Sequence, residues 1–517
     1  MRTESKSRVK NSISRAAFVA LAVMLQALWI VFIINTINEY FAEISLITTV
    51  FAVLIVLYIF GKEGNSAMKM PWIMFIFAFP VFGVVFYILC GTELPARRMK
   101  KKYLDLQDEW DNYVFQNEAV MAEIQEKDKR IYNQVRYIEK YSKSPICKCE
   151  ELEFFPDTMD AYNSMLKDLE SAKNFILMEY FAIEDAECFD GISAVLKRKV
   201  KEGVEVRIMY DDIGSLGFIN PKFARNLEKA GIQCRIFNPL IPFLNLVMNN
   251  RDHRKITVID GKVAYTGGYN LANEYFNMTH PYGIWKDSGV RFTGNAVRNY
   301  TKMLLHMWNM IEKTDTDYKR FFPEPVYVNA PKMCDDDKGY IQPFGDAPFL
   351  GEHIGESIYM NILKNAKDYV YITTPYLIIT DEMKRELCLA AKRGVDVRII
   401  TPGIPDKKIV YKVTRSYYAP LAKAGVRIYE FKEGFFHAKQ WVSDDEVAVV
   451  GTVNMDYRSL YLHFENGVYM YKTSQVKEVL KDCRRYFGNE VTQNYKTGIK
   501  SGLSIFECLL RIISPLL

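Results

Sequence analysis

Residues 253–260 read His-Arg-Lys-Ile-Thr-Val-Ile-Asp, and residues 437–444 read His-Ala-Lys-Gln-Trp-Val-Ser-Asp. In both stretches a lysine follows the histidine after two positions and an aspartate follows it after seven. Each stretch is followed by Gly-x-x-Asn, whose asparagine, Asn270 or Asn454, stands 17 residues after the histidine. A single His-x-Lys pair is a weak signal, but two copies with the same offsets indicate a duplicated functional unit.

The sequence around each copy repeats as well. Three pairs of segments correspond: 169–180 with 363–374, 203–209 with 394–400, and 230–236 with 424–428. Within each repeat, short β-branched strands alternate with helical stretches that end at Gly203 or Gly394, and glycine tolerates the left-handed C-cap conformation best. We therefore predict an α/β fold of two tandem domains, each with a mainly parallel sheet flanked by helices, related by a pseudo-twofold axis.

Three uncharged apolar runs precede the repeats, at about residues 16–34, 44–60 and 70–92. Each is close to the roughly 17 to 25 residues that cross a bilayer core, which favours transmembrane helices over buried helices of a soluble domain. The basic start of the chain resembles a signal peptide, but no small-residue cleavage site follows the first run. We therefore predict a multi-pass protein of the cell membrane.

Charged residues give conflicting evidence on the orientation of these runs. Three full crossings from a cytoplasmic N-terminus would place the repeats outside the cell. A basic cluster after the third run favours the cytoplasm instead; it consists of Arg97, Arg98, Lys100, Lys101 and Lys102. Two interpretations stay open: the third run, which contains Pro80 and Gly83, folds back as a re-entrant hairpin, or one of the charge rules fails.

These signals divide the chain into five parts. We expect a membrane region at 1–92, a helical linker at 93–140, a first domain at 141–325, a second domain at 326–498, and an amphipathic tail at 499–517.

Composition excludes several classes of protein. The 67 Lys and Arg residues nearly balance the 62 Asp and Glu residues, and a net charge of +5 provides no general basic field for nucleic acid. The nine cysteines are odd in number and mostly isolated, so they form no disulfide framework. Cys147 and Cys149 are the one close pair, and we interpret them as idle thiols rather than metal ligands. No bound metal or cofactor is predicted.

The residue types of the motif suit chemistry on a phosphodiester. Positions i and i+2 of a strand share a face, so His253 presents its imidazole beside the Lys255 ammonium, and His437 beside Lys439. If the repeats pair, two imidazoles, two ammonium groups and two asparagine amides face one phosphate. One histidine attacks phosphorus, the other serves as acid and base with a pKa near 6.5, and the lysines and asparagines bind phosphate.

Four carboxylates complete the predicted site. Asp287 and Glu465, downstream of the two motifs, are candidates to orient the imidazoles. Asp260 and Asp444 belong to the catalytic motif, but they follow strands, where aspartate commonly binds local backbone, so we expect them to support the site. The remaining histidines lack a counterpart in the other repeat and are interpreted as structural: His280, His306, His353 and His463.

These residues resemble the phospholipase D superfamily, and more closely its bacterial cardiolipin synthase branch. The matching elements are residues 250–261, the Trp285-x-Asp287 element, the apolar hairpin at 71–91, and Ser514-Pro-Leu-Leu517. The resemblance runs from about residue 44 to the end of the sequence, and the first apolar run is additional to the two spans that are usual in that branch.

The resemblance implies a reaction between two phosphatidylglycerol molecules. One gives its phosphatidyl group to His253 and releases glycerol, and the second accepts the group to form cardiolipin, with His437 as acid and base. Neither metal nor nucleotide takes part, and the partners are membrane lipids, not nucleic acid. The symmetry of the repeats does not decide which histidine is the nucleophile, and oligomeric state stays open.

Several alternatives remain at this stage. A nuclease, a phospholipase or a phosphatidylserine synthase of the same superfamily shares the motifs, and an inactive membrane scaffold is a fourth possibility. The insert at 239–247 either covers the site, dips into lipid, or is an ordinary buried loop. The apolar positions of the tail recur at helical spacing, which fits docking on the protein or on the membrane surface.

Overall fold

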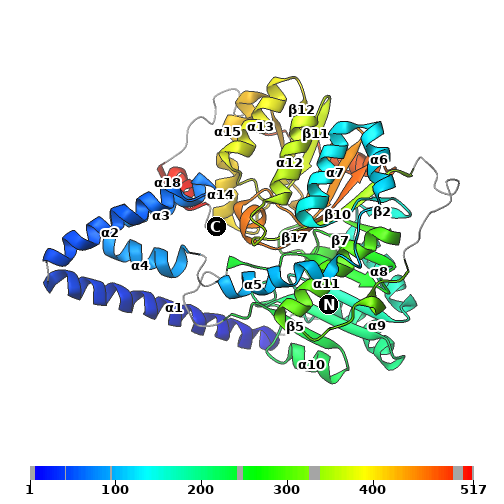
Figure 1. The fold of residues 1–517 in the computed structure, drawn as a ribbon, viewed down its shortest axis with the longest axis horizontal. Helices are drawn as coiled ribbons and strands as arrows, with labels where there is room; N and C mark the ends of the chain where they lie inside the picture. The colour runs from blue at the N-terminus through cyan, green and yellow to red at the C-terminus, as the bar shows by residue number, and fades with distance from the viewer. Residues whose placement is uncertain are drawn as a thin grey trace.

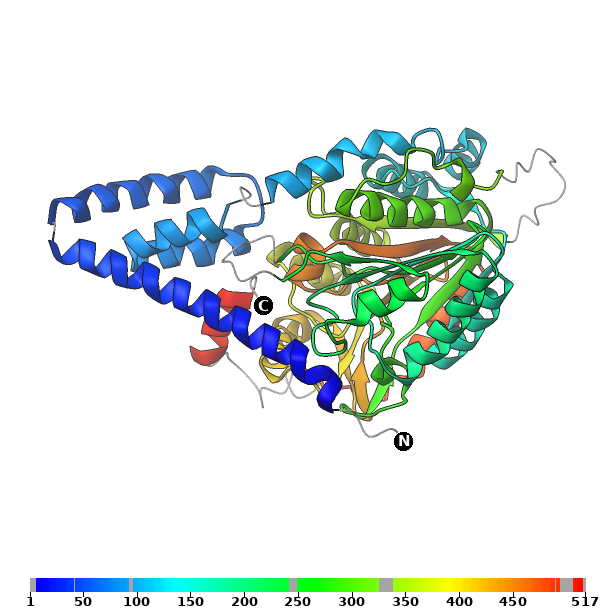
Figure 2. The ribbon, with the colours of Figure 1, turned by 90° about the horizontal axis from the view of Figure 1, so that it is seen from below.

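The computed structural model describes residues 6–40, 42–92, 96–240, 249–324, 338–488, 490–492 and 505–514. Two mixed sheets with covering helices form the main body, and a group of N-terminal helices extends from one side of it (Figures 1 and 2). The insert at 239–247 lies almost wholly outside the described residues, so its interpretation stays a prediction.

The first repeat forms a seven-stranded sheet in the order β2-β9-β7-β6-β3-β4-β5. Its strands are β2 Leu152–Phe155, β3 Phe175–Tyr180, β4 Glu205–Asp211, β5 Gln233–Phe237, β6 Lys255–Ile259, β7 Val263–Gly267 and β9 Gly289–Thr293. The accompanying helices are α8 Thr158–Ser171, α9 Glu187–Lys201, α10 Phe223–Lys229 and α11 Val297–Ile311, with short η3 Asn273–Phe276, η4 Gly294–Ala296 and η5 Lys319–Phe321.

The second repeat forms an eight-stranded sheet in the order β1-β10-β17-β16-β15-β11-β12-β13. Its strands are β1 Cys147–Lys148, β10 Tyr340–Asp346, β11 Tyr369–Thr373, β12 Asp396–Pro402, β13 Arg427–Phe431, β15 Gln440–Ser443, β16 Val447–Gly451 and β17 Glu465–Tyr471. Its helices are α12 Ile354–Asn365, α13 Asp381–Lys392, α14 Lys408–Ser416, α15 Tyr418–Ala424 and α16 Gln475–Arg484, with η7 Arg458–Leu462. β1 lies in the range expected for the first domain, yet it pairs with β10 of the second sheet.

Both sheets are mixed, so the prediction of mainly parallel sheets is wrong. Parallel pairing is confined to β3-β4-β5 and β11-β12-β13, and every other described pair within the two sheets is antiparallel. The motif strand is the reason, because β6 runs back beside β3 and then turns directly into β7. That turn passes through Asp260 at φ 53° and Gly261 at φ 64°, a left-handed pair that reverses the chain without a crossover helix.

The two sheets share an apolar core. Val258 and Val290 of the first sheet lie in one buried cluster with Val450 and Val468 of the second. Two further clusters lie under the helices on the outer faces of the sheets. Because each sheet buries its inner face against the other, the repeats form a single packed unit.

In the described part of residues 1–92 the helices are α1 Lys6–Tyr40, α2 Ala42–Gly61, α3 Ser66–Ala78 and α4 Pro80–Cys90. Among the described residues, Ala16–Ile33 of α1 is the one helical stretch long and apolar enough to cross a bilayer. The linker contains α5 Arg97–Asp105, η1 Gln107–Trp110, α6 Glu118–Lys127 and α7 Lys129–Ser142.

The third apolar run is not one continuous span, which corrects the prediction of a helix over 70–92. The chain breaks at Phe79, and Pro80 starts α4 at the first helical position, where a missing N–H costs nothing. α4 folds back on α3 so closely that a Cβ on Gly83 would lie 2.6 Å from the Ile76 Cα. The structure therefore has a helical hairpin at this run, and the re-entry of that hairpin into a membrane stays a prediction.

Candidate active site

The two motifs meet where the repeats face each other. The strand before His437, β14 Gly434–Phe436, pairs in parallel with β8 Ile284–Lys286 of the first repeat. The His437 amide donates to the Lys286 carbonyl at 2.7 Å, and the His253 amide donates to the Phe464 carbonyl at 2.9 Å. Each motif histidine is thus held by backbone of the other repeat.

The predicted orienting carboxylates lie beside the histidines, but in exchanged order. Nδ1 of His253 lies 2.9 Å from Oε1 of Glu465, which belongs to the second repeat. Nδ1 of His437 lies 2.5 Å from Oδ2 of Asp287, which belongs to the first. A carboxylate only accepts, so Nδ1 of His253 carries the hydrogen and leaves Nε2 with its lone pair. Nδ1 of His437 also has Lys439 Nζ at 2.9 Å, but its shorter contact is with Asp287, which assigns the same tautomer. The site therefore exists only when both repeats are folded together.

The motif lysines are buried beside the histidines. Lys255 Nζ donates to the His253 carbonyl at 2.6 Å, and Lys439 Nζ makes the same contact with the His437 carbonyl. Burial lowers the pKa of Lys255 from 10.5 to about 7 and the pKa of Lys439 to about 8. A buried lysine without a neutralising carboxylate attracts an anion such as phosphate. The site has two such lysines, one from each repeat.

The pKa values of the histidines differ from the sequence expectation of about 6.5. Burial lowers the pKa of His437 to about 3, with Lys439 as the next cause. Burial followed by Lys255 and Lys439 lowers the pKa of His253 well below its ordinary value. Both imidazoles are therefore neutral at neutral pH, which suits a nucleophile and requires an anion before either is protonated.

The two asparagines differ in their contacts. Asn270 Oδ1 accepts from the Ala182 amide at 3.1 Å, and its Nδ2 donates to the Tyr275 hydroxyl at 2.7 Å. Oδ1 of Asn454 is buried and has no hydrogen-bond partner among the described residues. Asn270 is thus engaged within its own repeat, whereas Asn454 retains an unused polar atom.

Asp260 and Asp444 do not reach the histidines, because they follow the opposite ends of their strands. Asp260 accepts from three successive backbone amides, those of residues 173, 174 and 175, at 2.7 to 2.9 Å. Asp444 accepts from the amides of residues 367, 368 and 369 at 2.9 to 3.0 Å. These contacts are of the supporting kind expected for the two motif aspartates, but the backbone they bind is distant in sequence rather than local.

Sequence reasoning missed the residue that follows each orienting carboxylate. Asn466 donates through Nδ2 to Thr266 Oγ1 at 2.8 Å and to the Tyr300 hydroxyl at 2.9 Å, both in the first repeat. Ser288 Oγ accepts from Gln440 Nε2 of the second repeat at 2.8 Å. Aligning Asp287-Ser288 with Glu465-Asn466 would have indicated this pair of polar contacts across the repeats.

His463 breaks the symmetry of the site. It aligns with Trp285, whose ring centre lies 5.1 Å from that of His437, while the His463 ring lies 5.6 Å from His253. His253, His463 and Glu465 bring potential metal-ligating atoms within 4.8 Å of one another. Nδ1 of His253 is already hydrogen-bonded to Glu465, so a metal bound between these two groups through Nδ1 would have to displace that proton.

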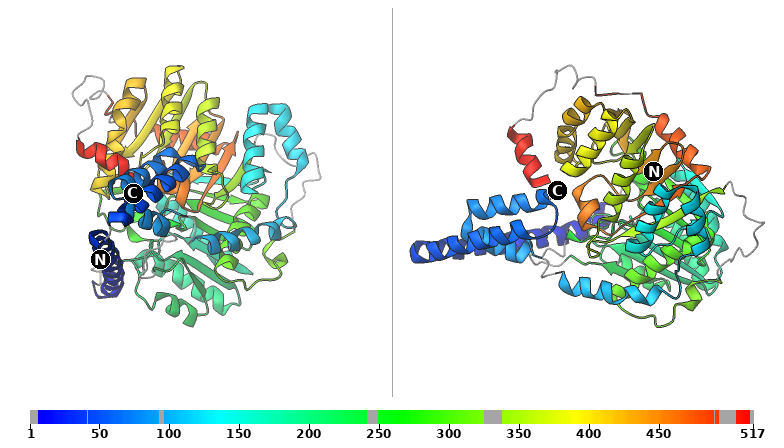
Figure 3. Two further views of the ribbon diagram at one scale, coloured as in Figure 1. Left: turned by 60° about the vertical axis from the view of Figure 1, so that its left-hand side comes forward. Right: turned by 45° about the horizontal axis from the view of Figure 1, so that its top comes forward.

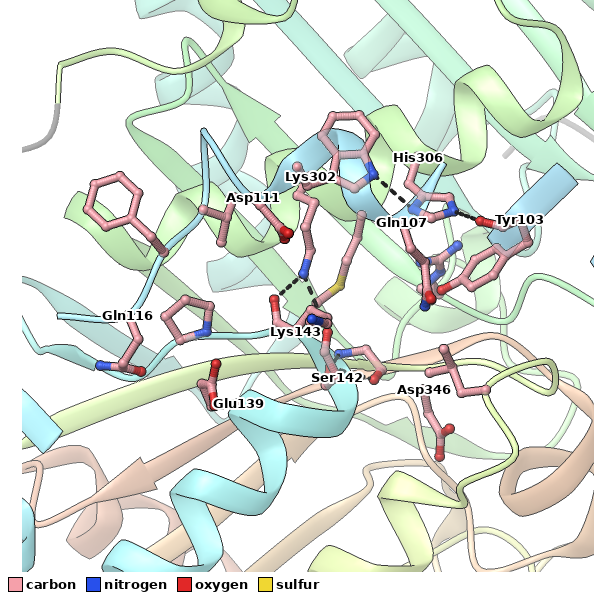
Figure 4. A pocket seen from close by; sticks show the side chains of 18 of the residues that line it. Tyr103, Gln107, Asp111, Gln116, Glu139, Ser142, Lys143, Lys302, His306 and Asp346 are labelled. Carbon is pink, nitrogen blue, oxygen red and sulfur yellow. Dashed lines mark hydrogen bonds between the residues drawn. The ribbon is translucent and has the colours of Figure 1, made fainter. Parts of the chain in front are cut away.

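A separate cavity of about 420 Å³ lies between the linker and α11 (Figure 4). Lys302 points into it and donates to the Ser142 carbonyl at 3.4 Å, and His306 accepts from Trp110 Nε1 at 3.1 Å. These bonds fasten the linker to the first repeat. Neither motif histidine and neither motif lysine is among the residues that line this cavity.

Comparison with known proteins agrees with this geometry. Residues 165–308 and 359–489 match the family model described as cardiolipin synthase, PLD-like domain, and residues 47–91 match the one described as phospholipase D-nuclease N-terminal. Fold and paired motif thus define a protein with two phospholipase D-like domains.

Relatives that align with most of the chain identify its family within this superfamily. The chain is 39% identical over 469 residues to an uncharacterised protein of Streptococcus mutans, covering 89% of this chain and 99% of that one. It is 31% identical over 482 residues to a cardiolipin synthase of Alkalihalophilus pseudofirmus, covering 92% and 94%. The chain belongs to the cardiolipin synthase family of the phospholipase D superfamily.

A solved structure shares the fold. A phosphatidylserine synthase of Haemophilus influenzae superposes with a TM-score of 0.55 at 13% identity, over 74% of this chain and 98% of that one.

Proposed function

We propose that this protein is a cardiolipin synthase, a phosphatidyltransferase that joins two phosphatidylglycerol molecules and releases glycerol. The observation that carries the proposal is the pair of His–carboxylate dyads exchanged between the repeats, each with a buried lysine. Two imidazoles with free Nε2 atoms and two ammonium groups suit the two-step displacement of an alcohol at a phosphodiester. The family relatives named cardiolipin synthase support the choice of lipid substrate.

In the first step, Nε2 of His253 attacks phosphorus of the first phosphatidylglycerol. A P–N bond forms and the P–O bond to the glycerol headgroup breaks. His437 gives a proton to the departing glycerol oxygen. Burial and Lys439 lower the pKa of His437, and the anionic phosphate opposes both effects, so His437 takes up this proton from solvent on Nε2 when the substrate binds.

In the second step, a terminal hydroxyl of another phosphatidylglycerol attacks the phosphohistidine. His437, now neutral, takes the hydroxyl proton as a new P–O bond forms and the P–N bond to His253 breaks. Glu465 holds the His253 ring through Nδ1 in both steps, and Asp287 does the same for His437. Asn270 and Asn454, whose Nδ2 groups are donors, stay the predicted additional phosphate contacts.

We place the protein in a bacterial cell membrane as a multi-pass protein. α1 supplies one span, while α2 and the α3–α4 hairpin lie in the same membrane region at residues 1–92. The catalytic unit comprises domains at 141–325 and 326–498, joined to the membrane region by the linker at 93–140.

One assay tests the proposal. The full chain is reconstituted in vesicles with labelled phosphatidylglycerol, and the lipids are separated after incubation with and without a chelator. Cardiolipin with an equal amount of free glycerol, unaffected by chelation, is the expected result. Phosphatidic acid as the main product would make the protein a phospholipase, and absence of turnover would refute the proposal.

The assignment of roles is tested separately. Covalent labelling by phosphatidylglycerol should disappear in His253→Ala and persist in His437→Ala, where the intermediate forms but does not turn over at a normal rate. The opposite pattern would reverse the two roles without changing the reaction.

A further inference from the structure

Three exposed isoleucines gather beside the second motif. Ile284, Ile404 and Ile409 are 49%, 38% and 53% exposed. The Ile404 amide donates to the Gly434 carbonyl at 3.1 Å, and the Ile404 side chain lies against Gly283, so Ile404 and Ile284 share one corner of the β8–β14 pair. Ile409 follows in the first turn of α14. Exposed aliphatic side chains gathered at one place mark a surface that meets an apolar partner.

An aromatic wall leads inward from this corner to the active site. The rings of Trp285 and Phe435 lie 4.8 Å apart, and each lies within 6 Å of the His437 ring. The Tyr282 ring lies 6.2 Å from both. Packed aromatic groups therefore connect the exposed isoleucines with the ring of His437, so this corner is a part of the surface that lies beside the second motif.

Basic residues surround the same isoleucines. Lys407, Lys408 and Lys412 are exposed on the loop after β12 and on α14. The Lys407 ammonium lies 5.7 Å from the centre of the Tyr376 ring, and it is one of the positive charges that lower the pKa of His253. Lysines interspersed with exposed aliphatic side chains are the pattern of a protein face that lies on anionic lipid.

The tail connects this corner to the membrane region. The C-terminal helix α18 Ile505–Ile513 contacts both α14 and α3, and it lies between the N-terminal helices and the second repeat (Figures 1 and 3). Leu510 is buried and Arg511 donates to the Ser416 carbonyl at 2.9 Å, whereas Leu509 is 56% exposed. One face of α18 thus packs on the protein, and the face that carries Leu509 is exposed.

We propose that this mouth face, made of Ile284, Ile404, Lys407, Lys408, Ile409 and Lys412, docks onto the surface of an anionic phospholipid bilayer. The proposal rests on the proposed function and extends it, because it states the side from which lipid enters. Headgroups contact the lysines and the isoleucines dip below them, which holds the second motif beside the bilayer surface. Continuity with α18 and α3 makes a bilayer the favoured partner over a soluble protein.

The first test measures contact without turnover. Single cysteines replace Ile404 or Ile409 in a chain whose nine native cysteines are all replaced by Ser or Ala and which still turns over phosphatidylglycerol, and each is labelled with bimane after reconstitution in phosphatidylglycerol nanodiscs. Lipids brominated near the headgroup should quench bimane at 404 and 409. The control is Leu389→Cys on α13, which is 45% exposed and is not part of the mouth face, and it should not be quenched. Equal quenching at all three positions, or none at 404 and 409, would refute the docking face.

The second test separates docking from chemistry. Ile404→Asp/Ile409→Asp should raise KM for phosphatidylglycerol held in the nanodisc by about tenfold or more, because each carboxylate resists entering lipid. The rate on soluble dihexanoyl-phosphatidylglycerol should stay within about twofold, since that substrate needs no docking. Equal loss on both substrates would contradict the proposal. If the unaltered chain turns over neither substrate, the proposed function fails, while the quenching result still decides the docking face.

Discussion

At the scale of single residues, the site depends on carboxylates supplied across the repeats. Glu465 is fully buried, contacts His253 through both oxygens at 2.9 and 3.0 Å, and accepts from the Thr452 hydroxyl. Asp287 is equally buried and holds His437. Their carboxylates fix which ring nitrogen carries the proton, so they determine whether Nε2 is available for chemistry.

We predict that Glu465→Gln and Asp287→Asn each lower kcat by about 10² to 10⁴ while the chain stays folded. An amide can donate to Nδ1, which moves the imidazole proton to Nε2 and blocks attack or proton transfer. Rapid-quench measurement of phosphohistidine should show slow formation in Glu465→Gln and slow breakdown in Asp287→Asn. A normal rate in either variant would show that its carboxylate has no part in orienting the ring.

The buried lysines give activity and stability opposite dependences on pH. Their pKa values of about 7 and 8 mean that the ammonium forms, which attract phosphate, exist below those values. kcat/KM should therefore fall as pH rises through about 7 to 8.

Stability should move the other way over the same interval. The folded-state pKa of Lys255 is depressed, so above about pH 7 the unfolded chain binds more protons than the folded one, and the free energy of unfolding rises with pH up to the unfolded pKa near 10.5. Denaturant midpoints at pH 7 and pH 9 measure this effect. Lys255→Met should show a smaller rise than the unaltered chain, and an unchanged rise would contradict the assignment.

At the scale of elements, the sequence predicts the motif strand β6 more fully than it predicts how the neighbouring strands pair with it. Because side chains alternate along a strand, the spacing of His253 and Lys255 is sufficient to place both on one face. Strand direction cannot be predicted in this way, since a run of β-branched residues reads the same in parallel and antiparallel pairs. The same limit applies to the third apolar run, where hydropathy indicates a span and only Pro80 and Gly83 hint at the hairpin.

Asp260 holds the turn between β6 and β7 in place through hydrogen bonds to backbone amides. We predict that Asp260→Ala lowers the free energy of unfolding by about 1 to 3 kcal/mol, because three backbone amides lose a charged acceptor. kcat of the folded fraction should change by less than about twofold, since the side chain lies far from the histidines. Asp260→Asn should lose less stability because it keeps one acceptor and tolerates positive φ. A fall in kcat without a fall in stability would restore a catalytic role.

At the scale of the whole molecule, the duplication predicts one shared site, but it does not predict which repeat supplies the carboxylate for each histidine. Two nearly equivalent repeats offer His253 a carboxylate from either copy, and no pattern in the sequence distinguishes Asp287 from Glu465 as its partner. In the structure, the pairing of β8 with β14 and the bridge between Asp252 and Phe464 place each histidine beside the carboxylate of the other repeat. The repeats are therefore one catalytic unit rather than two.

A cut between the repeats tests that conclusion. We predict that a protease site placed within 325–337 can be cleaved with activity kept within about threefold, because β1 pairs with β10, both sheets share a core, and the dyads bind across the repeats. Neither half alone should transfer phosphatidyl groups, since each lacks the carboxylate that orients its own histidine. The halves should co-purify after cleavage and lose activity together when separated in denaturant. Turnover by an isolated half would mean that one repeat contains a complete site, and the exchanged dyads would then have no catalytic meaning.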